Sequence, residues 1–147
     1  MKAGSLRLVE YRTRVMIDAE PSRVWSVLTD FESYDEWNDF YRKVVSKGHE
    51  SDRIRMHVTL GKLKVVSIER IRQREDNRIL SWGVDNVFLR SGVERRLSRT
   101  EGGRTEVTGV FRAAGLVAEI SMPLFGQHIQ AGMEHFLEAL KKRVENT

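Results

Sequence analysis

Polar and apolar residues alternate over the middle of the chain. Residues 53–60 read Arg-Ile-Arg-Met-His-Val-Thr-Leu, which is the period of a strand with one buried face. Because short turns join the strand-like segments, the pattern predicts an antiparallel meander over residues 53–112. Its strands are expected at residues 53–60, 63–74, 79–84, 87–99 and 104–112. The turns between them are Gly61-Lys62, Asp76-Asn77, Asp85-Asn86 and Gly102-Gly103. Gly92 interrupts the fourth strand, where a β-bulge is expected to bend the sheet.

The segment before the meander predicts one strand and two short helical pieces. A strand is expected at residues 6–17, and a helix is expected to begin at Pro21 or Ser22. The inward face of that helix consists of Val24, Trp25, Val27 and Leu28. Residues 30–40 predict a second helical or turn segment, with aromatic side chains three residues apart at Phe31, Tyr34 and Trp37.

The end of the chain predicts a long amphipathic helix from about Ser121 to Glu145. Ser121 is the expected N-cap, and Pro123 suits the first turn. The apolar stripe of this helix consists of Phe125, Ile129, Met133, Phe136, Leu140 and Val144. The inner face of the meander is the apolar surface large enough to cover that stripe. The sequence therefore predicts one α+β domain over residues 1–147, in which a curved antiparallel sheet packs against a C-terminal helix.

Composition narrows the location and the chemistry. Hydrophobic residues make up 40% of the chain, and no apolar run approaches the roughly 18 residues of a membrane span. We therefore expect a soluble chain without a transmembrane segment. The chain has no cysteine, which removes disulfides, thiolate nucleophiles and cysteine-based metal sites. The cytoplasm is the default location for such a chain.

The net charge of +4 raises the question of an anionic partner. The 25 Lys and Arg residues are interleaved with 21 Asp and Glu residues, so no long basic run forms. The nearest approach to a basic cluster comprises Arg53, Arg55, Lys62, Lys64, Arg70, Arg72, Arg74 and Arg78. Most of these alternate with apolar residues, which is typical of the solvated outer face of a sheet. No DNA partner is expected, and a weak contact with RNA or anionic lipid stays open.

The order of elements and the segment 19–38 resemble a known group of proteins. The shared features are the helix start Ala19-x-Pro21, the aromatic Trp25, the run Leu28-Thr29-Asp30-Phe31 and the motif Tyr34-x-x-Trp37-Asn38. The chain is similar to the START-like, or SRPBCC (helix-grip), superfamily, and most closely to its polyketide cyclase/dehydrase-like branch. The resemblance implies about seven strands in the order strand, two short helices, six strands and long helix. It also implies a hydrophobic cavity between the sheet and the last helix.

Candidate ligand-binding residues are those expected on the inner face of the sheet, on the facing helix stripe, or at the mouth of the cavity. They are Trp37, Met56, Val58, Trp82, Val84, Arg95, Val107, Phe111, Phe125, Ile129, Met133 and Phe136. The same residue types also form ordinary filled cores. Arg95 faces inward if the alternation from Val93 to Leu97 holds, and outward if a bulge at Gly92 shifts the register. A buried arginine needs a partner, and an anionic or carbonyl-bearing ligand is one.

Catalytic and metal-binding candidates are few. Asp85 and Glu119 lie near apolar neighbours and are candidate general bases, although each is expected at an exposed edge. His128 and His135 share one flank of the last helix about 10 Å apart, which is too far to chelate one metal. No metal site and no cofactor are expected, and hydrolase, NTPase and dinucleotide motifs are lacking.

Three functions fit the sequence. The first is a protein that binds an apolar or amphipathic small molecule of lipid, polyketide or aromatic type in the cavity. The second is a cyclase or dehydratase acting on such a molecule, which requires an inward polar residue with a shifted pKa. The third is an interaction module that uses the basic sheet face. The first ranks ahead because the expected lining is apolar and contains no recognisable catalytic pair. A weak homodimer is also left open.

Overall fold

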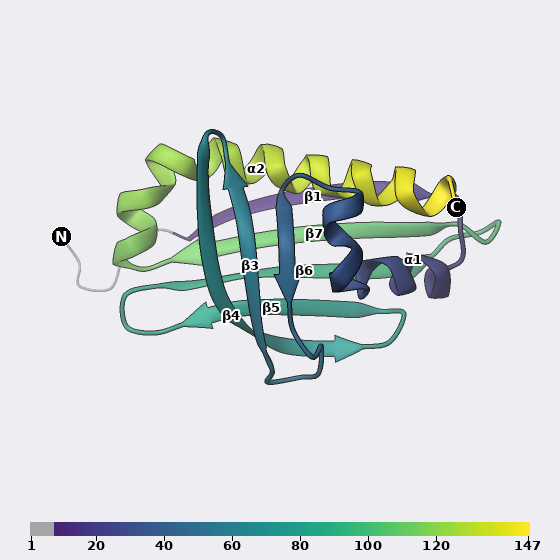
Figure 1. Cartoon of the computed structure of the whole chain (residues 1–147), viewed down its shortest axis with the longest axis horizontal. Helices are drawn as coiled ribbons and strands as arrows, with labels where there is room; N and C mark the ends of the chain where they lie inside the picture. Colours follow the sequence, from purple (N-terminus) through teal and green to yellow (C-terminus); the bar gives the residue numbers. More distant parts are fainter. Residues whose placement is uncertain (1–7) are drawn as a thin grey trace.

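The computed structural model of the chain describes residues 8–147 (Figure 1). Seven strands form one antiparallel sheet in the order β1-β7-β6-β5-β4-β3-β2. They are β1 (Val9–Ile17), β2 (Tyr41–Val45), β3 (Arg53–Leu60), β4 (Leu63–Glu75), β5 (Ile79–Asp85), β6 (Arg90–Arg99) and β7 (Thr105–Ala114). The helical elements are α1 (Pro21–Leu28), the 3-10 helix η1 (Phe31–Glu36) and α2 (Leu116–Glu145). The predicted α+β architecture is confirmed, and α2 runs along the curved sheet (Figure 1). Residues 6 and 7 of the first predicted strand lie outside the described residues.

The predicted turns have the backbone conformation that their residues favour. Gly61 and Asn77 adopt φ of 64° and 65°, a left-handed region that glycine and asparagine enter at low cost. Gly102 and Gly103 adopt φ of 85° and 77° in the last turn of the meander. Short turns keep consecutive strands adjacent, so β2 to β7 are neighbours in chain order and β1 pairs with β7.

The expected bulge at Gly92 is wrong. β6 pairs with both of its neighbours without a register shift at this point, and Gly92 lies opposite Gly83 of β5. The two glycines instead make room for the Arg72 side chain, which donates a hydrogen bond to the Val84 carbonyl. A Cβ added at Gly83 would lie 2.6 Å from the Arg72 guanidinium carbon. The unbroken register keeps Arg95 on the inner face of the sheet.

The 3-10 helix η1 explains the aromatic spacing and the Tyr-x-x-Trp-Asn motif. A 3-10 helix has three residues per turn, so Phe31 and Tyr34 lie on one side of it and both are buried. The amide of Asn38 donates to the Tyr34 carbonyl, and its oxygen accepts from the Tyr41 backbone N–H, each at 2.8 Å. Asn38 thereby joins the end of η1 to the start of β2.

The last helix begins at Leu116, five residues before the predicted N-cap. Gly115, at φ 106°, precedes it, and the Ser121 hydroxyl donates to the Val117 carbonyl inside the helix instead of capping it. Pro123 therefore lies within α2, where it has no backbone N–H to donate. Figure 1 shows the first turns of α2 at an angle to the remainder, as expected near an internal proline.

The strand predicted at residues 87–99 also begins later, at Arg90. The Asn86 side-chain oxygen accepts hydrogen bonds from the backbone N–H groups of Phe88 and Leu89, at 2.8 and 2.9 Å. These donors are therefore taken by a local turn and do not extend the strand. Val87 and Phe88 are left exposed in the β5–β6 loop, residues 86–89.

The core lies between the inner face of the sheet and α2. The buried side chains of α2 include Ile129, Met133, Phe136, Leu140 and Val144, as the apolar stripe predicts, and also Leu137, which the predicted stripe did not contain. Phe125 departs from the stripe and is only partly buried. At that turn Gly126 faces the sheet, because a Cβ there would collide with the Tyr11 hydroxyl. Within residues 8–147, no helix combines the length and apolar character that a membrane crossing requires.

Candidate functional site

An interior cavity of about 250 Å³ lies between the inner face of the sheet and the first half of α2. Its wall is mainly apolar, with polar groups from Tyr41, Ser67, Glu69, Ser91 and Ser121. The apolar lining residues are Phe40, Met56, Val58, Leu60, Val65, Trp82, Leu89, Val93, Phe111, Ala113, Val117, Met122, Ile129 and Met133. An apolar space with a few polar groups is typical of small-molecule sites.

Six of the twelve predicted ligand-binding residues line this cavity. They are Met56, Val58, Trp82, Phe111, Ile129 and Met133. Three strands and α2 supply them, so the sheet and the helix both contribute to the wall.

Trp37 and Phe136 do not line this cavity but a separate groove of about 410 Å³. Their rings pack together with centroids 5.1 Å apart, and Trp37 also contacts Tyr34. This packing attaches η1 to α2. His128 and His135 line the same groove, and no cluster of metal-ligating side chains occurs among residues 8–147.

Val84, Val107 and Phe125 also lie outside the cavity wall. Val84 lines a separate hollow beside Arg70 and Arg72. Val107 is fully buried near the start of β7, under the second half of α2. The Lys141 ammonium of α2 donates to the Met16 carbonyl of β1 at 2.7 Å and so joins the helix to this part of the sheet. Met16 pairs with Glu106, the neighbour of Val107, so α2 packs directly on the sheet there.

Arg95 lies directly behind the cavity wall and is fully buried. Its guanidinium carbon is 4.2 Å from the centre of the Phe136 ring, 5.4 Å from that of Trp82 and 5.5 Å from that of Tyr41. Nη2 donates to the Tyr41 hydroxyl at 3.4 Å and to the Met133 sulfur at 3.6 Å. Within the described part of the chain, Nε and Nη1 have no hydrogen-bond partner. The cation is therefore stabilised by aromatic faces but is not neutralised by a carboxylate.

Tyr41 lines the cavity and its hydroxyl accepts a hydrogen bond from Arg95, so it connects the buried cation to the cavity. Burial raises the pKa of the Tyr41 phenol, and the nearby Arg95 charge partly opposes that rise. The phenol is therefore neutral near pH 7 and keeps its proton. Because its oxygen already accepts from Arg95, that proton is available to an acceptor inside the cavity.

Glu69 is the acidic side chain of the cavity, and it was not among the residues that the sequence predicts for the site. Burial raises the pKa of the Glu69 carboxyl, while a 2.6 Å hydrogen bond from the Ser67 hydroxyl and the charge of Arg72 lower it. The two faces of β4 are similarly apolar in sequence, so its own pattern does not orient it. Pairing with β3 does, because Glu69 lies opposite Ile54 and Ser67 opposite Met56, both buried on the inner face. The two acids that the sequence singled out, Asp85 and Glu119, are both exposed, as expected.

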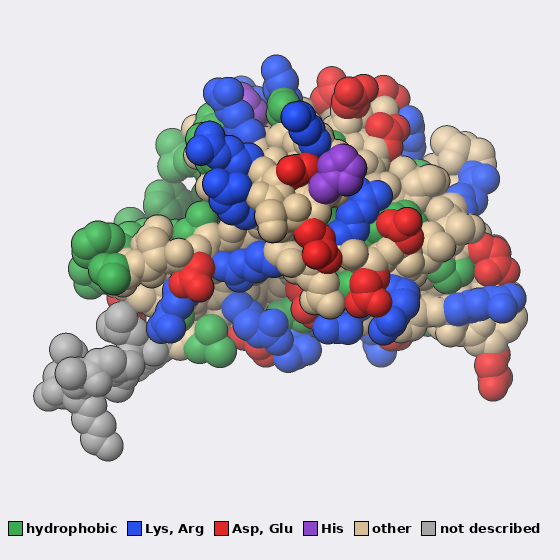
Figure 2. Space-filling view, turned by 90° about the horizontal axis from the view of Figure 1, so that it is seen from below, with side chains coloured by type: hydrophobic (Ala, Val, Ile, Leu, Met, Phe, Trp, Pro, Cys, Tyr) green, Lys and Arg blue, Asp and Glu red, His purple; other side chains and the backbone are tan. Residues whose placement is uncertain are grey.

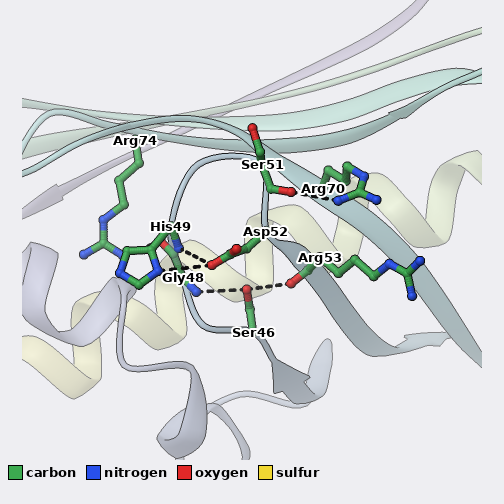
Figure 3. Close-up of polar contacts among 8 residues, drawn as sticks. All are labelled: Ser46, Gly48, His49, Ser51, Asp52, Arg53, Arg70 and Arg74. Carbon is green, nitrogen blue, oxygen red and sulfur yellow. Dashed lines mark hydrogen bonds and ion pairs between the residues drawn. The ribbon is translucent and has the colours of Figure 1, made fainter.

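The basic residues of β4 are largely engaged by the protein itself. Arg70 and Arg74 donate to the carbonyls of Ser51 and Gly48, at 2.8 and 2.7 Å, and so hold the β2–β3 loop in place (Figure 3). Inside that loop, the Asp52 carboxylate accepts from the His49 backbone N–H and lies 3.2 Å from its ring Nδ1. Arg70 and Arg74 thus have a structural role. Because their guanidinium groups are already engaged, they offer less support for an interaction module on the basic sheet face.

The whole-chain comparisons agree with this architecture. A family model described as polyketide cyclase / dehydrase and lipid transport matches residues 9–145. The chain belongs to this family. The predicted START-like, SRPBCC resemblance is therefore confirmed, and the family has a ligand-binding fold. Among curated protein sequences, no match to the chain was found.

Solved structures with the same fold share little sequence with this family member. A START superfamily protein from Mycobacterium smegmatis is 19% identical with a TM-score of 0.75, over 93% of this chain and 97% of that one. The Zhui aromatase/cyclase from Streptomyces sp. R1128 is 16% identical with a TM-score of 0.78, over 95% and 94% of the two chains. Norcoclaurine synthase from Thalictrum flavum, in complex with dopamine and hydroxybenzaldehyde, is 12% identical with a TM-score of 0.71, over 97% and 89%. At these identities the likeness establishes the fold.

The raised pKa of Glu69 predicts that Glu69→Gln stabilises the protein by an amount that depends on pH. Folding favours the protonated carboxyl of Glu69. Its contribution to the stability of the fold is therefore complete below about pH 4 and is lost as the pH rises through the raised pKa. Glu69→Gln should therefore raise the melting temperature more at about pH 8 than at about pH 4. Thermal melts of both proteins across that range measure the difference. Glu101→Gln, in the exposed turn between β6 and β7, is the control and should show no such trend. An equal effect at both pH values would contradict the assignment of Glu69 to the buried cavity wall.

Proposed function

We propose that this protein binds an apolar small molecule bearing one anionic or carbonyl oxygen in the interior cavity. The observation that carries the proposal is Arg95, a buried cation with two unpartnered nitrogen donors behind a mainly apolar wall. Burying a charge without a carboxylate is costly, and such a cost is tolerated where the charge serves a site. A ligand oxygen that accepts from the Tyr41 hydroxyl would extend the Arg95–Tyr41 contact into the cavity.

The volume of the cavity limits the ligand. A cavity of roughly 150 Å³ is enough to hold benzene. The 250 Å³ here therefore suits a molecule of one or two rings, or a short acyl chain. The aromatic walls of Trp82 and Phe111 favour ring stacking. The aromatic ligands named for the norcoclaurine synthase complex support the same choice.

The test compares two probes, 2-naphthoate and naphthalene, which share the ring system and differ in the carboxylate. We expect 2-naphthoate to bind at least about tenfold more tightly, because it adds a charge-assisted hydrogen bond. Ala113→Leu fills the cavity from β7 and should abolish the binding of both probes without unfolding the protein. Ala131→Leu, on the exposed side of α2, is the matched control and should bind as the wild type does. Quenching of tryptophan fluorescence measures both affinities. Equal affinities for the two probes, or unchanged binding by Ala113→Leu, would count against the proposal.

A second prediction distinguishes a role of Arg95 in ligand binding from a purely structural role. Arg95→Met should stabilise the ligand-free protein by about 1–3 kcal/mol, because it removes a buried charge that has no carboxylate partner. The same variant should lose the preference for 2-naphthoate over naphthalene. Urea unfolding and the probe titration measure the two effects. Arg55→Met, on the exposed face of β3, should change neither. A marked loss of stability in Arg95→Met would instead assign Arg95 a structural role.

A cyclase or dehydratase activity is the second candidate, and the pair Glu69 and Tyr41 favours it. Both side chains line the cavity, and burial raises the pKa of each. A carboxyl with a raised pKa suits a general base near neutral pH, and a neutral phenol can donate to a ketone oxygen. In a two-ring β-hydroxy ketone, Glu69 would remove the proton next to the carbonyl and return it to the departing hydroxyl. That step releases water and leaves an enone, which tautomerises to a phenol.

The dehydration of 3-hydroxy-1-tetralone to 1-naphthol tests this candidate by absorbance. Turnover should fall by about 100-fold or more in Glu69→Gln, since general base catalysis contributes about that much. Binding of naphthalene should persist in the same variant. Equal turnover by the wild type and Glu69→Gln would leave ligand binding as the function.

A further inference from the structure

The outer face of the sheet, which points away from the cavity, is divided into two parts of different charge. Four outward arginines of β1, β6 and β7 form ion pairs with glutamates: Arg12, Arg14, Arg96 and Arg112. On the described strands β2, β3 and β4 as far as Arg72, no outward position holds an Asp or Glu. The acid of this segment, Glu69, lines the cavity on the other face. Figure 2 shows Lys and Arg side chains grouped at the upper left of the view, the side on which β3 and β4 lie in Figure 1.

Strand pairing places four of these cations in one line. Arg53 of β3 lies directly opposite Arg70 of β4. Arg72 occupies the next exposed position along β4, and Arg55 extends the line in the other direction along β3. All four side chains are exposed, so their guanidinium groups start from neighbouring positions on the surface.

The line continues onto β2, the edge strand of the sheet. Lys43 lies opposite His57, which is the outward residue after Arg55. Arg42 stands beside a register shift in β2, and its side chain donates to the Thr59 hydroxyl on the outer face at 2.9 Å. Partial burial lowers the pKa of His57, and the charges of Arg55, Lys43 and Arg42 lower it further. We call the six residues of this line the cationic track: Arg42, Lys43, Arg53, Arg55, Arg70 and Arg72.

The protein does not neutralise the cationic track. Among residues 8–147, none of its six members forms an ion pair with a carboxylate. Arg42, Arg70 and Arg72 each donate one hydrogen bond, and each acceptor is an uncharged oxygen. Like charges directly opposite each other destabilise a sheet, so the pairing of Arg53 with Arg70 costs stability. Costs of this kind are typical of functional surfaces.

Acidic side chains flank one end of the cationic track. Asp85 and Glu69 line a hollow of about 490 Å³ there, and three arginines of the track line it with them, so its net charge stays positive. Glu50 and Asp52 of the β2–β3 loop accept hydrogen bonds from backbone N–H groups of the chain. The acids near the track therefore reduce its charge without cancelling it.

The length and shape of the cationic track suit a single chain of phosphates. Six residue steps along the strands separate the level of Arg72 from that of Lys43, which is about 20 Å. A stacked strand with one phosphate per 3.4 Å places about six nucleotides over that length. Five of the six residues are arginines, whose planar guanidinium groups bind phosphate oxygens bidentately. A line of cations matches a linear polyanion, whereas an anionic bilayer presents its charge over an area.

Other partners match the cationic track less well. A second copy of the chain docked on this face would bring two tracks of like charge together. Protein-binding hot spots are rich in Trp and Tyr, and no aromatic side chain points outward on the described strands β2, β3 and β4. The exposed apolar residues of this face are aliphatic: Val45, Val66 and Ile68.

We propose that the cationic track binds single-stranded RNA through its phosphates, without reading its sequence. RNA is the polyanion that cells contain mainly as single strands. Phosphate contacts carry no sequence information, and the track has no aromatic ring on which a base would stack. The track lies on the opposite face of the sheet from the cavity, so this proposal is independent of the ligand that the cavity holds.

The test uses the full chain and a fluorescein-labelled uridine RNA of about twelve nucleotides, within the usual size of a single-strand site. The track variant carries Arg53→Glu and Arg55→Glu, and the first of these places opposite charges across from each other at Arg70, so the fold is retained. The control carries Arg104→Glu and Lys142→Glu, two exposed cations before β7 and on α2. Both variants bring the formal net charge from +4 to 0, so their total charge is matched.

Fluorescence anisotropy at low salt should show that the wild type and the control bind alike, and that the track variant binds at least about tenfold more weakly. Raising the salt from about 50 to about 200 mM should weaken wild-type binding about 50-fold if four phosphates are neutralised. The slope of log affinity against log salt should become shallower by about 1.4 in the track variant, which has lost two contacts.

The absence of cysteine from the chain permits a local reading of the same binding. Val45→Cys places a nitrobenzoxadiazole dye beside Arg55, which lies opposite Val45 in the sheet. Glu138→Cys, on the exposed side of α2, is the control. The emission of the dye should change on adding RNA to the Val45→Cys variant and should stay unchanged in the Glu138→Cys variant.

Four outcomes would overturn the proposal. They are no RNA binding by the wild type at low salt, an equal loss in the track and control variants, an affinity that does not depend on salt, and tighter track-dependent binding to DNA or phosphatidylserine vesicles than to RNA. The second would mean that net charge alone attracts RNA, and the last would assign the track to another polyanion. The track variant should bind 2-naphthoate as the wild type does, which keeps this question separate from the proposed function.

Discussion

The stacking of Arg95 against Phe136 links the sheet to the helix at the centre of the molecule. The guanidinium belongs to β6, Phe136 to α2, and the other two rings that surround it belong to β2 and β5. A cation enclosed by aromatic faces retains part of the stabilisation that water would supply. It still leaves two donors unpaired, and this imperfect compensation sets the chemistry of the neighbouring cavity. The Tyr41 hydroxyl accepts from Arg95, and the proposed preference for an oxygen-bearing ligand rests on that contact.

The position of the cavity depends on how α2 meets the sheet. Along its second half, large side chains from Phe136 to Val144 are buried in the core. Along its first half, the internal Pro123 interrupts the backbone hydrogen bonds of the helix, and Gly126 allows close approach to Tyr11. The open space therefore lies beneath the first half of the helix. One amphipathic helix thus completes the core with its second half and covers the cavity with its first half.

The β5–β6 loop and the first turns of α2 depart from the structure that their sequence predicts. Val87 and Phe88 were expected at the start of a strand, yet the Asn86 side-chain oxygen accepts from the backbone N–H groups of Phe88 and Leu89. Leu116 and Ile120 precede the expected helix start, yet Gly115 begins the helix there and turns them outward. Departures of this kind concentrate at functional surfaces, because exposed apolar groups reduce solubility without stabilising the fold.

The sequence by itself determined the meander, the long helix and the family-level fold. Strict alternation in β3, positive-φ residues at the turns and the period of the α2 stripe are local signals, and each segment carries its own evidence. Half of the predicted cavity residues followed from the same periodicity. The tertiary structure decided the rest, because residues distant in the chain determine which face of a strand points inward and which residues the helix covers. Pairing with β3 turned Glu69 inward, an unshifted register at Gly92 buried Arg95, and the packing of α2 excluded Val107 and Phe136 from the cavity. A strand's period fixes which residues share a face, but only its neighbours decide which face is inside.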